Sequence, residues 1–364
     1  MIRRRKDPSY YGMYLLFISS MILAACVHGA EARPAEVPLW QGKKEIVLRK
    51  LLTIGGNDLG EPNLVIGGIN DIAFDSEDNV YILDFVNYRV SKFSSDGHFL
   101  AHYGKGKGQG PGELQYPTGV CVDPKGNVYI ADLRQRIIHV YDKSNSEINF
   151  IRTEKNIGPI FGMAVSSDME LYAGVDLAFS TWEGGLFQIF SLPAGKYIGS
   201  FADCAWFTSH RNVMSGNNCM VMDESRGLII VSHANPYRID VFSRKRELVR
   251  SFGRRADIFD TYVPDRNSNK IMAGTTINLA CLPSGIIINV VRHLTKSPED
   301  MSTSRQFDFF NLDGDYLLAA LDKAFGIEGA YNLVFKSDSK GNLWISYNEP
   351  YPHLDKLSIQ FRDK

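Results

Sequence analysis

The sequence predicts an all-β fold, a six-bladed β-propeller in which each blade is a four-stranded antiparallel sheet. The main observation is a recurring hairpin: residues 72–84 (IAFDSEDNVYILD) match residues 120–132 (VCVDPKGNVYIAD) at a constant offset of 48. The composition agrees, because 12% aromatic residues and 32 glycines suit strands joined by tight turns. A repeated sheet that cannot bury both faces alone must pack against its neighbours, which favours a closed ring.

The amino-terminal residues 1–25 contain a basic segment, a short apolar run and small residues, the pattern of a secretory signal peptide. The apolar run is shorter than the roughly 20 residues that a membrane-spanning helix needs. Its end, Leu23-Ala24-Ala25-Cys26, resembles the lipobox of bacterial lipoproteins, which implies that Cys26 is acylated and begins the mature chain. An ordinary signal peptide cut nearby and a cytosolic chain remain as alternatives.

Residue 27 is Val and not Asp, so the resemblance to Gram-negative lipoproteins implies no retention at the inner membrane. We therefore expect an exported protein anchored in the outer membrane of the cell envelope. Residues 26–42 follow as the lipidated Cys and a tether that contains two prolines.

Residues 43–364 are predicted to form one propeller, because six hairpins of the same kind follow one another. The two clearest copies are followed by weaker ones at 163–172, 220–231, 279–289 and 333–345. Further strand pairs follow most of these hairpins, as at 89–103 and 238–252, so each unit has four strands.

The predicted ring is closed by the amino-terminal strand. The last unit has about three strands, the third at 357–361, whereas residues 45–54 form a strand with no hairpin before it. We predict that this strand completes the sixth blade and leaves no open sheet edge.

Residues 103–132, followed by Arg136-Ile137, resemble the NHL repeat almost residue by residue. From about residue 43 onward the chain resembles the NHL-type (TolB-like) six-bladed propeller lipoproteins of bacteria, strongly over 65–142 and less between 143 and 332. This resemblance implies a lipid-anchored module that binds a protein, peptide or glycan without catalysis. A structural role in a larger envelope complex is a further alternative.

The charge balance excludes one class of partner. Forty basic residues stand against 41 acidic ones, a net charge of −1, so the chain has no overall positive field to hold nucleic acid or an anionic membrane surface. The segment before Cys26 is basic, so its removal would leave a mildly acidic mature chain.

Several sequence patterns that could mark a binding or catalytic site are interpreted as structural. The glycine-rich run 104–112 leads into a strand and does not open a helix, so we interpret it as an inter-blade loop and not as a phosphate cradle. His98 and His102 are predicted to lie on a solvated outer strand, not in a metal site. Aspartates and arginines that recur in register are predicted to shape blades and cap hairpin turns. These are Asp75, Asp84, Asp123, Asp132, Asp223, Asp338, Arg89, Arg136 and Arg238.

The cysteines after Cys26 fall into two groups. Cys121 and Cys281 are predicted on the innermost strands of the second and fifth blades, too far apart for a disulfide. Cys204 and Cys219 flank an irregular loop, and an exported protein could oxidise them to a disulfide.

Positions that break the symmetry are where we expect function. The starts of the innermost strands ring one mouth of the channel and carry the polar residues Asn70, Asp71, Thr118, Asn218, Asn278 and Asn332. They could converge on a small ligand or a divalent cation, as in the lactonase-type enzymes that this fold resembles. Asp71 is the one carboxylate among them, and amide oxygens alone hold such a cation weakly. A metal-assisted hydrolase or lyase is therefore the alternative function, and no other cofactor is expected.

Two longer segments, 205–218 and 254–269, are richer in the aromatic and arginine side chains that anchor interfaces. We predict that they form the partner-binding face, through Trp206, Phe207, His210, Arg211, Phe259, Tyr262 and Arg266.

Overall fold

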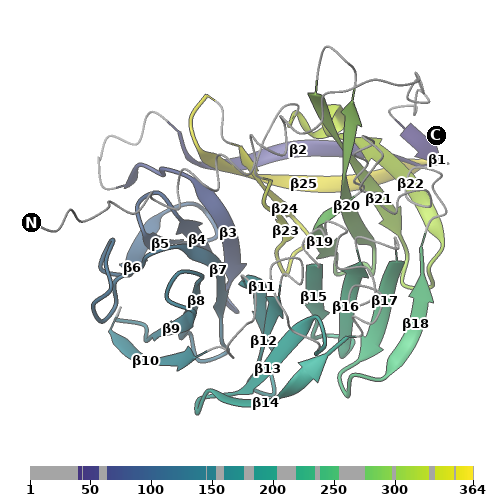
Figure 1. Cartoon of the computed structure of the whole chain (residues 1–364). Coiled ribbons are helices and arrows are strands. Elements are labelled where there is room, and N and C mark those ends of the chain that lie inside the picture. The colour runs from purple at the N-terminus through teal and green to yellow at the C-terminus, as the bar shows by residue number, and fades with distance from the viewer. Residues whose placement is uncertain are drawn as a thin grey trace, which may run out of the picture.

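The computed structural model is a ring of six antiparallel sheets, and the predicted all-β six-bladed propeller is confirmed (Figure 1). It describes residues 40–42, 44–56, 64–144, 146–152, 160–175, 184–202, 219–233, 238–253, 275–296, 301–327, 333–347 and 350–363. Among these residues there is no helix that is both long and apolar enough to cross a membrane.

Blades 1 to 3 each contain four consecutive strands, numbered from the innermost outward. Blade 1 comprises β3 (Ile69–Phe74), β4 (Val80–Asp84), β5 (Arg89–Phe93) and β6 (Phe99–Tyr103). Blade 2 comprises β7 (Pro117–Val122), β8 (Val128–Asp132), β9 (Ile137–Tyr141) and β10 (Glu147–Arg152). Blade 3 comprises β11 (Ile160–Val165), β12 (Glu170–Val175), β13 (Phe187–Ser191) and β14 (Lys196–Phe201).

Blades 4 and 5 continue the same order through the region where the repeat is hardest to see in the sequence. Blade 4 comprises β15 (Cys219–Asp223), β16 (Leu228–His233), β17 (Arg238–Ser243) and β18 (Leu248–Phe252). Blade 5 comprises β19 (Thr275–Cys281), β20 (Ile287–Lys296), β21 (Met301–Phe310) and β22 (Tyr316–Leu321), followed by the short 3₁₀ helix η3 (Asp322–Phe325).

The sixth blade is completed by the amino-terminal strand, as predicted. Its sheet order is β2 (Lys44–Gly55), β25 (His353–Asp363), β24 (Leu343–Tyr347) and β23 (Phe335–Ser337). β2 pairs with β25 along its whole length, and the two strands lie side by side although they come from opposite ends of the chain (Figure 1). The third strand of this blade is longer than the predicted 357–361, because β25 extends to match β2.

Blade 5 has a fifth strand that the sequence analysis did not predict. Residues assigned to the tether form β1 (Trp40–Gly42), which pairs antiparallel with the outer edge of β22. An outermost strand has unpaired backbone groups, and the chain satisfies some of them as it passes blade 5 on its way into blade 6. The tether therefore ends before residue 40.

The core is divided into six clusters of buried apolar side chains, one between each pair of neighbouring blades. In the seam between blades 1 and 2, for example, Tyr81 and Leu83 pack with Val120 and Ile130, all at most 1% exposed. Alternation along each strand sends successive side chains to opposite faces, so every blade contributes to two seams.

The two faces of the ring differ in their connections. On the tight-turn face, all turns within blades have four or five residues: 75–79, 94–98, 123–127, 142–146, 166–169, 192–195, 224–227, 244–247, 282–286, 311–315 and 338–342. The opposite loop face carries every connection between blades: 56–68, 104–116, 153–159, 202–218, 253–274 and 322–334. It also carries the connections between the second and third strands of each blade.

Candidate functional site

Four of the predicted channel-mouth residues, Asn70, Asp71, Thr118 and Asn278, lie at the starts of innermost strands on the loop face. Asn218 and Asn332 lie outside the described residues. The contacts of these four side chains show what each one does.

Asn70 and Asn278 bridge neighbouring blades. Asn70 Nδ2 donates to the carbonyl oxygens of Pro117 (3.2 Å) and Thr118 (3.3 Å) in blade 2. Asn278 Nδ2 donates to Leu333 O at 2.7 Å, just before blade 6. Each amide therefore links the innermost strand of its own blade to the next one along the ring.

Asp71 is buried and its carboxylate has three donors. The backbone N–H groups of Ile72 and Val120 donate to it at 2.8 and 3.0 Å. Lys336 Nζ lies 2.6 Å from Oδ1 and also donates to Ile72 O. Because Val120 belongs to blade 2 and Lys336 to blade 6, this one carboxylate connects three blades across the point where the ring closes.

Lys336 was missed in the sequence analysis, although a signal for it exists. In the aligned hairpins it occupies the position of Ala73, Cys121 and Ala164, so it is a charged residue where other blades have a small one. Its side chain is about one-third exposed, 31%, whereas the side chain of Asp71 is 10% exposed. The pair places one ammonium and one carboxylate at the centre of the ring.

Thr118 is buried, and its hydroxyl donates to Ala131 O at 3.5 Å within blade 2. Within the parts of the chain that the structure describes, no three His, Cys, Asp or Glu side chains lie close enough to share a metal ion. The described channel-mouth side chains thus hold strands together at the loop face.

The predicted partner-face residues lie outside the described residues, but the chain connectivity places both segments. Residues 202–218 join β14 to β15, and residues 253–274 join β18 to β19. Both connections begin at the end of an outermost strand and finish at the start of an innermost strand. Their anchored ends are therefore on the loop face, together with Asp71 and Asn278.

A two-stranded arm also marks this face, and no repeat pattern predicted it. β20 and β21 pair as far as Lys296↔Met301, whereas β19 stops opposite Arg292 and β22 stops opposite Gln306. Beyond these points the hairpin has no neighbouring strand among the described residues. Its far end rises past the adjacent strands of blade 5 (Figure 1).

The glycine-rich run of residues 104–112 is an inter-blade loop, as interpreted from the sequence. Its backbone is closed by hydrogen bonds such as Lys105 N to Gly112 O (2.8 Å). The carboxylate of Glu113 accepts a hydrogen bond from Gly110 N at 2.8 Å. An internal carboxylate therefore occupies the amide-lined position that a phosphate would need.

The recurring aspartates shape turns, as predicted. Asp84 accepts hydrogen bonds from the backbone of Gly67, Gly68 and Asn87, and Asp132 does the same in blade 2. In the hairpin turns, each carboxylate accepts N–H groups two to four residues later. This holds for Asp75, Asp123, Asp223 and Asp338.

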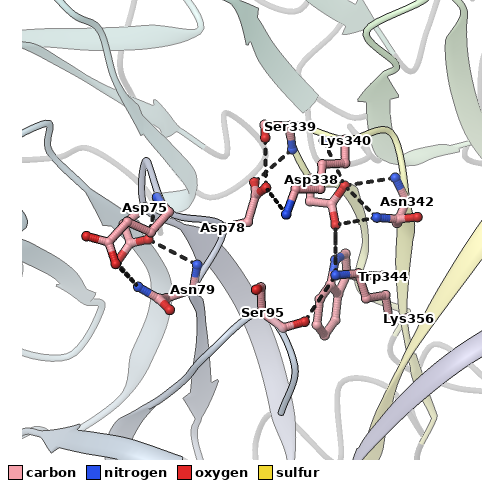
Figure 2. A network of polar contacts seen from close by, with 11 residues as sticks. Asp75, Asp78, Asn79, Ser95, Asp338, Ser339, Lys340, Asn342, Trp344 and Lys356 are labelled. Atoms are coloured by element: carbon pink, nitrogen blue, oxygen red, sulfur yellow. Dashed lines mark hydrogen bonds and ion pairs between the residues drawn. The ribbon is translucent and has the colours of Figure 1, made fainter. Parts of the chain in front are cut away.

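The tight-turn face contributes to ring closure. Figure 2 shows Asp78 of blade 1 accepting hydrogen bonds from Ser339 N and Oγ of blade 6, at 3.0 and 2.8 Å. Beside it, Lys356 Nζ donates to Ser95 O at 3.1 Å and lies 3.4 Å from Asp338. These contacts tie the turns of the first and last blades together, and the polar groups drawn are used within the fold.

Two further predictions concern histidine and cysteine. His98 is exposed beside Asp96, whereas His102 packs on Phe99 and is hydrogen bonded to Ser91. Cys26 and Cys204 lie outside the described residues, so lipidation and the Cys204–Cys219 disulfide stay predictions.

Comparison with known proteins supports the repeat assignment. Residues 61–163 match the family DUF5128, described as a 6-bladed beta-propeller. NHL repeat-containing protein 3 of Homo sapiens is 30% identical over 100 residues, 24% of this chain and 28% of the relative. The same protein of Mus musculus matches with the same identity and coverage. The chain thus spans little more than a quarter of these curated relatives.

Similarity to solved structures extends over most of the chain and supports the propeller fold. A DUF4221 member from Bacteroides vulgatus has a TM-score of 0.60 at 10% identity, over 88% of this chain and 99% of the other. A gluconolactonase from Xanthomonas campestris has a TM-score of 0.50 at 15% identity, over 80% of this chain and 87% of the other. At these identities the likeness establishes the fold alone. The chain is a six-bladed β-propeller, and about a quarter of it is similar to NHL repeat-containing proteins.

Proposed function

We propose that this chain is an exported, lipid-anchored propeller that binds a protein, peptide or glycan partner through its loop face. The observation that carries the proposal is the difference between the two faces. Turns of four or five residues cover one face, whereas the other carries the connections 202–218 and 253–274 and the β20–β21 arm. Long connections on a rigid scaffold are the usual place for recognition, because they can vary without disturbing the core.

The composition of the long connections fits a binding role. They contain Trp206, Phe207 and Arg211 in one segment and Phe259 and Tyr262 in the other. Aromatic and arginine side chains supply most of the affinity in protein interfaces, because they offer large contact areas and several hydrogen bonds.

The alternative, a metal-assisted hydrolase or lyase, would use Asp71 as a ligand. That carboxylate is held by Lys336 and two backbone N–H groups, so a metal would have to displace the ammonium. The gluconolactonase likeness concerns the fold and does not favour this alternative. Metal analysis of the purified protein separates the two: a stoichiometric divalent ion that Asp71→Ala removes would support the enzyme.

The test of binding is capture of partners from detergent-solubilised membranes, followed by comparison of variants. Trp206→Ala/Phe207→Ala should reduce the recovery of a specific partner at least tenfold. The matched control, Ser225→Ala/Lys245→Ala, changes two residues of the tight-turn face and should leave recovery unchanged. Recovery that neither pair alters, or that both reduce equally, would contradict a binding site on the loop face.

The lipid anchor is tested separately. Cys26→Ser should move the protein from the membrane fraction to the soluble fraction, because acyl chains contribute about 0.8 kcal/mol per buried CH₂ group. Continued sedimentation of this variant with membranes would refute the anchor and leave the binding proposal to be judged by the capture experiment.

A further inference from the structure

The point where the tether meets the propeller follows from the direction of β1. β22 runs from the turn 311–315 on the tight-turn face toward the loop face and ends at Leu321. β1 is antiparallel to it, with Trp40 opposite Ala320 and Gly42 opposite Leu318. The chain therefore reaches the propeller at the loop face, on the outer edge of blade 5, and then descends toward the tight-turn face.

The length of chain before β1 sets the distance that the tether can span. Residues 27–39 can span at most about 45 Å even when fully extended. The strands of blade 5 separate the two faces by about 20 Å, since each residue in a strand advances about 3.4 Å. The tether is long enough to permit either orientation, but because it joins the ring at the loop face, that face reaches a membrane-embedded Cys26 by the shortest path.

The described part of the loop face is positively charged. Among the described residues of the loop face, the exposed charged side chains are all basic: Lys105, Lys107, Arg134, Arg136 and Lys323. The tight turns instead carry exposed side chains of both signs, acidic at Glu77, Asp168 and Glu224 and basic at Lys125, Lys143 and Lys340, among other residues. The net charge of −1 conceals the basic character of the described loop face, because it sums over the whole chain.

Exposed apolar side chains accompany the basic ones. On the loop face, where blades 6 and 1 meet, Val65, Val86 and Tyr351 are 50%, 47% and 47% exposed. Basic side chains near an anionic bilayer each contribute attraction, and apolar or aromatic groups insert at the level of the headgroups. The loop face thus combines both features of a surface that contacts lipid.

We infer that the loop face lies against an anionic lipid surface, so the partner of the propeller is one that is found at that membrane surface. The inference rests on the lipid anchor at Cys26 proposed above. It adds an orientation: the tight-turn face points away from the bilayer, and recognition takes place in the gap between the ring and the membrane.

The experiment uses the lipidated protein in phosphatidylglycerol-containing vesicles whose headgroups carry a nitroxide quencher. A fluorophore is attached at Gln109→Cys on the loop face or at Ser76→Cys on the tight-turn face. The protein that carries neither introduced cysteine is labelled in the same way and serves as the blank. Both residues are exposed in the folded chain. We expect quenching at Gln109→Cys to be at least threefold stronger than at Ser76→Cys.

Charge variants show whether the basic side chains set the orientation. Lys105→Gln/Lys107→Gln should reduce the difference between the probes at least twofold. Lys125→Gln/Lys143→Gln, an equal change of charge on the tight-turn face, should preserve it. Equal quenching of both probes, or stronger quenching at Ser76→Cys, would overturn the inference. Cys26→Ser distinguishes this from a failed anchor: its release from the vesicles shows that the anchor works, whereas unchanged binding of this variant would show that the anchor proposal itself has failed.

Discussion

The carboxylate of Asp71 lies 2.6 Å from the ammonium nitrogen of Lys336, and this ion pair joins the innermost strands of the first and last blades. The two residues are far apart in the sequence and meet because the ring closes. Val120 N of blade 2 donates to the same carboxylate, so the contact secures two seams. Loss of either charge should therefore be felt in the stability of the whole ring.

Asp71→Asn should lower the free energy of unfolding by about 2 kcal/mol, less than the roughly 3–5 kcal/mol for a fully buried pair, because Lys336 is partly exposed. Urea denaturation measures the change. The Lys336→Met variant and the double variant complete a double-mutant cycle. Strictly additive losses would show that the two side chains do not interact.

Removal of residues 44–55 should greatly lower the melting temperature, because it strips the outermost strand from blade 6 and opens the ring. Calorimetry or circular dichroism measures the transition. Deletion of residues 40–42 is the matched control: it removes the three pairs of β1 with β22, so its effect should be small. A protein without residues 44–55 that melts like the full chain would contradict the closure.

Asp75→Asn should make the stability less sensitive to acid. Burial tends to raise the pKa of Asp75, but the hydrogen bond from Asn79 and the ion pair with Lys92 outweigh it, so the pKa lies below its ordinary value. A lowered pKa stabilises the fold above the unfolded value of about 3.9 and is lost as the pH falls through the folded value. Denaturation at pH 7 and pH 3 should show a smaller drop in the variant, and an equal drop would contradict this.

Cys121 and Cys281 should react slowly with thiol reagents in the native protein. Burial raises the pKa of Cys281 to about 12 and moves the pKa of Cys121 in the same direction, so few thiolates form at pH 8. Ellman's reagent measures the rate with and without guanidinium, which should expose both thiols. Rapid native reaction that Cys121→Ala and Cys281→Ala abolish would contradict the burial.

The Cys204–Cys219 disulfide is tested by intact mass. If it forms in the exported protein, reduction before measurement should add the mass of two hydrogens, and Cys204→Ser should abolish that difference. An unchanged mass after reduction would show that the pair is not oxidised.

The blades were predictable because their information is local. Apolar alternation and turns such as Asp123 to Asn127 specify a hairpin within about a dozen residues, and the recurrence of that hairpin indicates the ring. The strand left over at residues 45–54 predicted the closure for the same reason. β1 was missed because Trp40-Gln41-Gly42 has no strand pattern of its own and depends on the edge of β22.

The candidate site was predictable only in part. The sequence identified Asp71 and Asn278 as polar groups at the ends of the innermost strands. It also contains Lys336 as a charged residue within an apolar strand, a signal that was not used. The bonds that each side chain makes depend on which blades are neighbours, and that follows from closure over the whole chain. The contact of Asp71 with blade 6 could not be deduced from one hairpin.

The sequence by itself thus determined the repeat, the number of blades and the strand that closes them, since these depend on short-range patterns and on counting. The tertiary structure alone decided that the central carboxylate belongs to an ion pair, that the chain reaches the ring at the loop face, and that the exposed charged side chains of the described loop face are basic. These properties arise when residues distant in the chain are brought together, and the packing of six sheets in a circle fixes which of them meet.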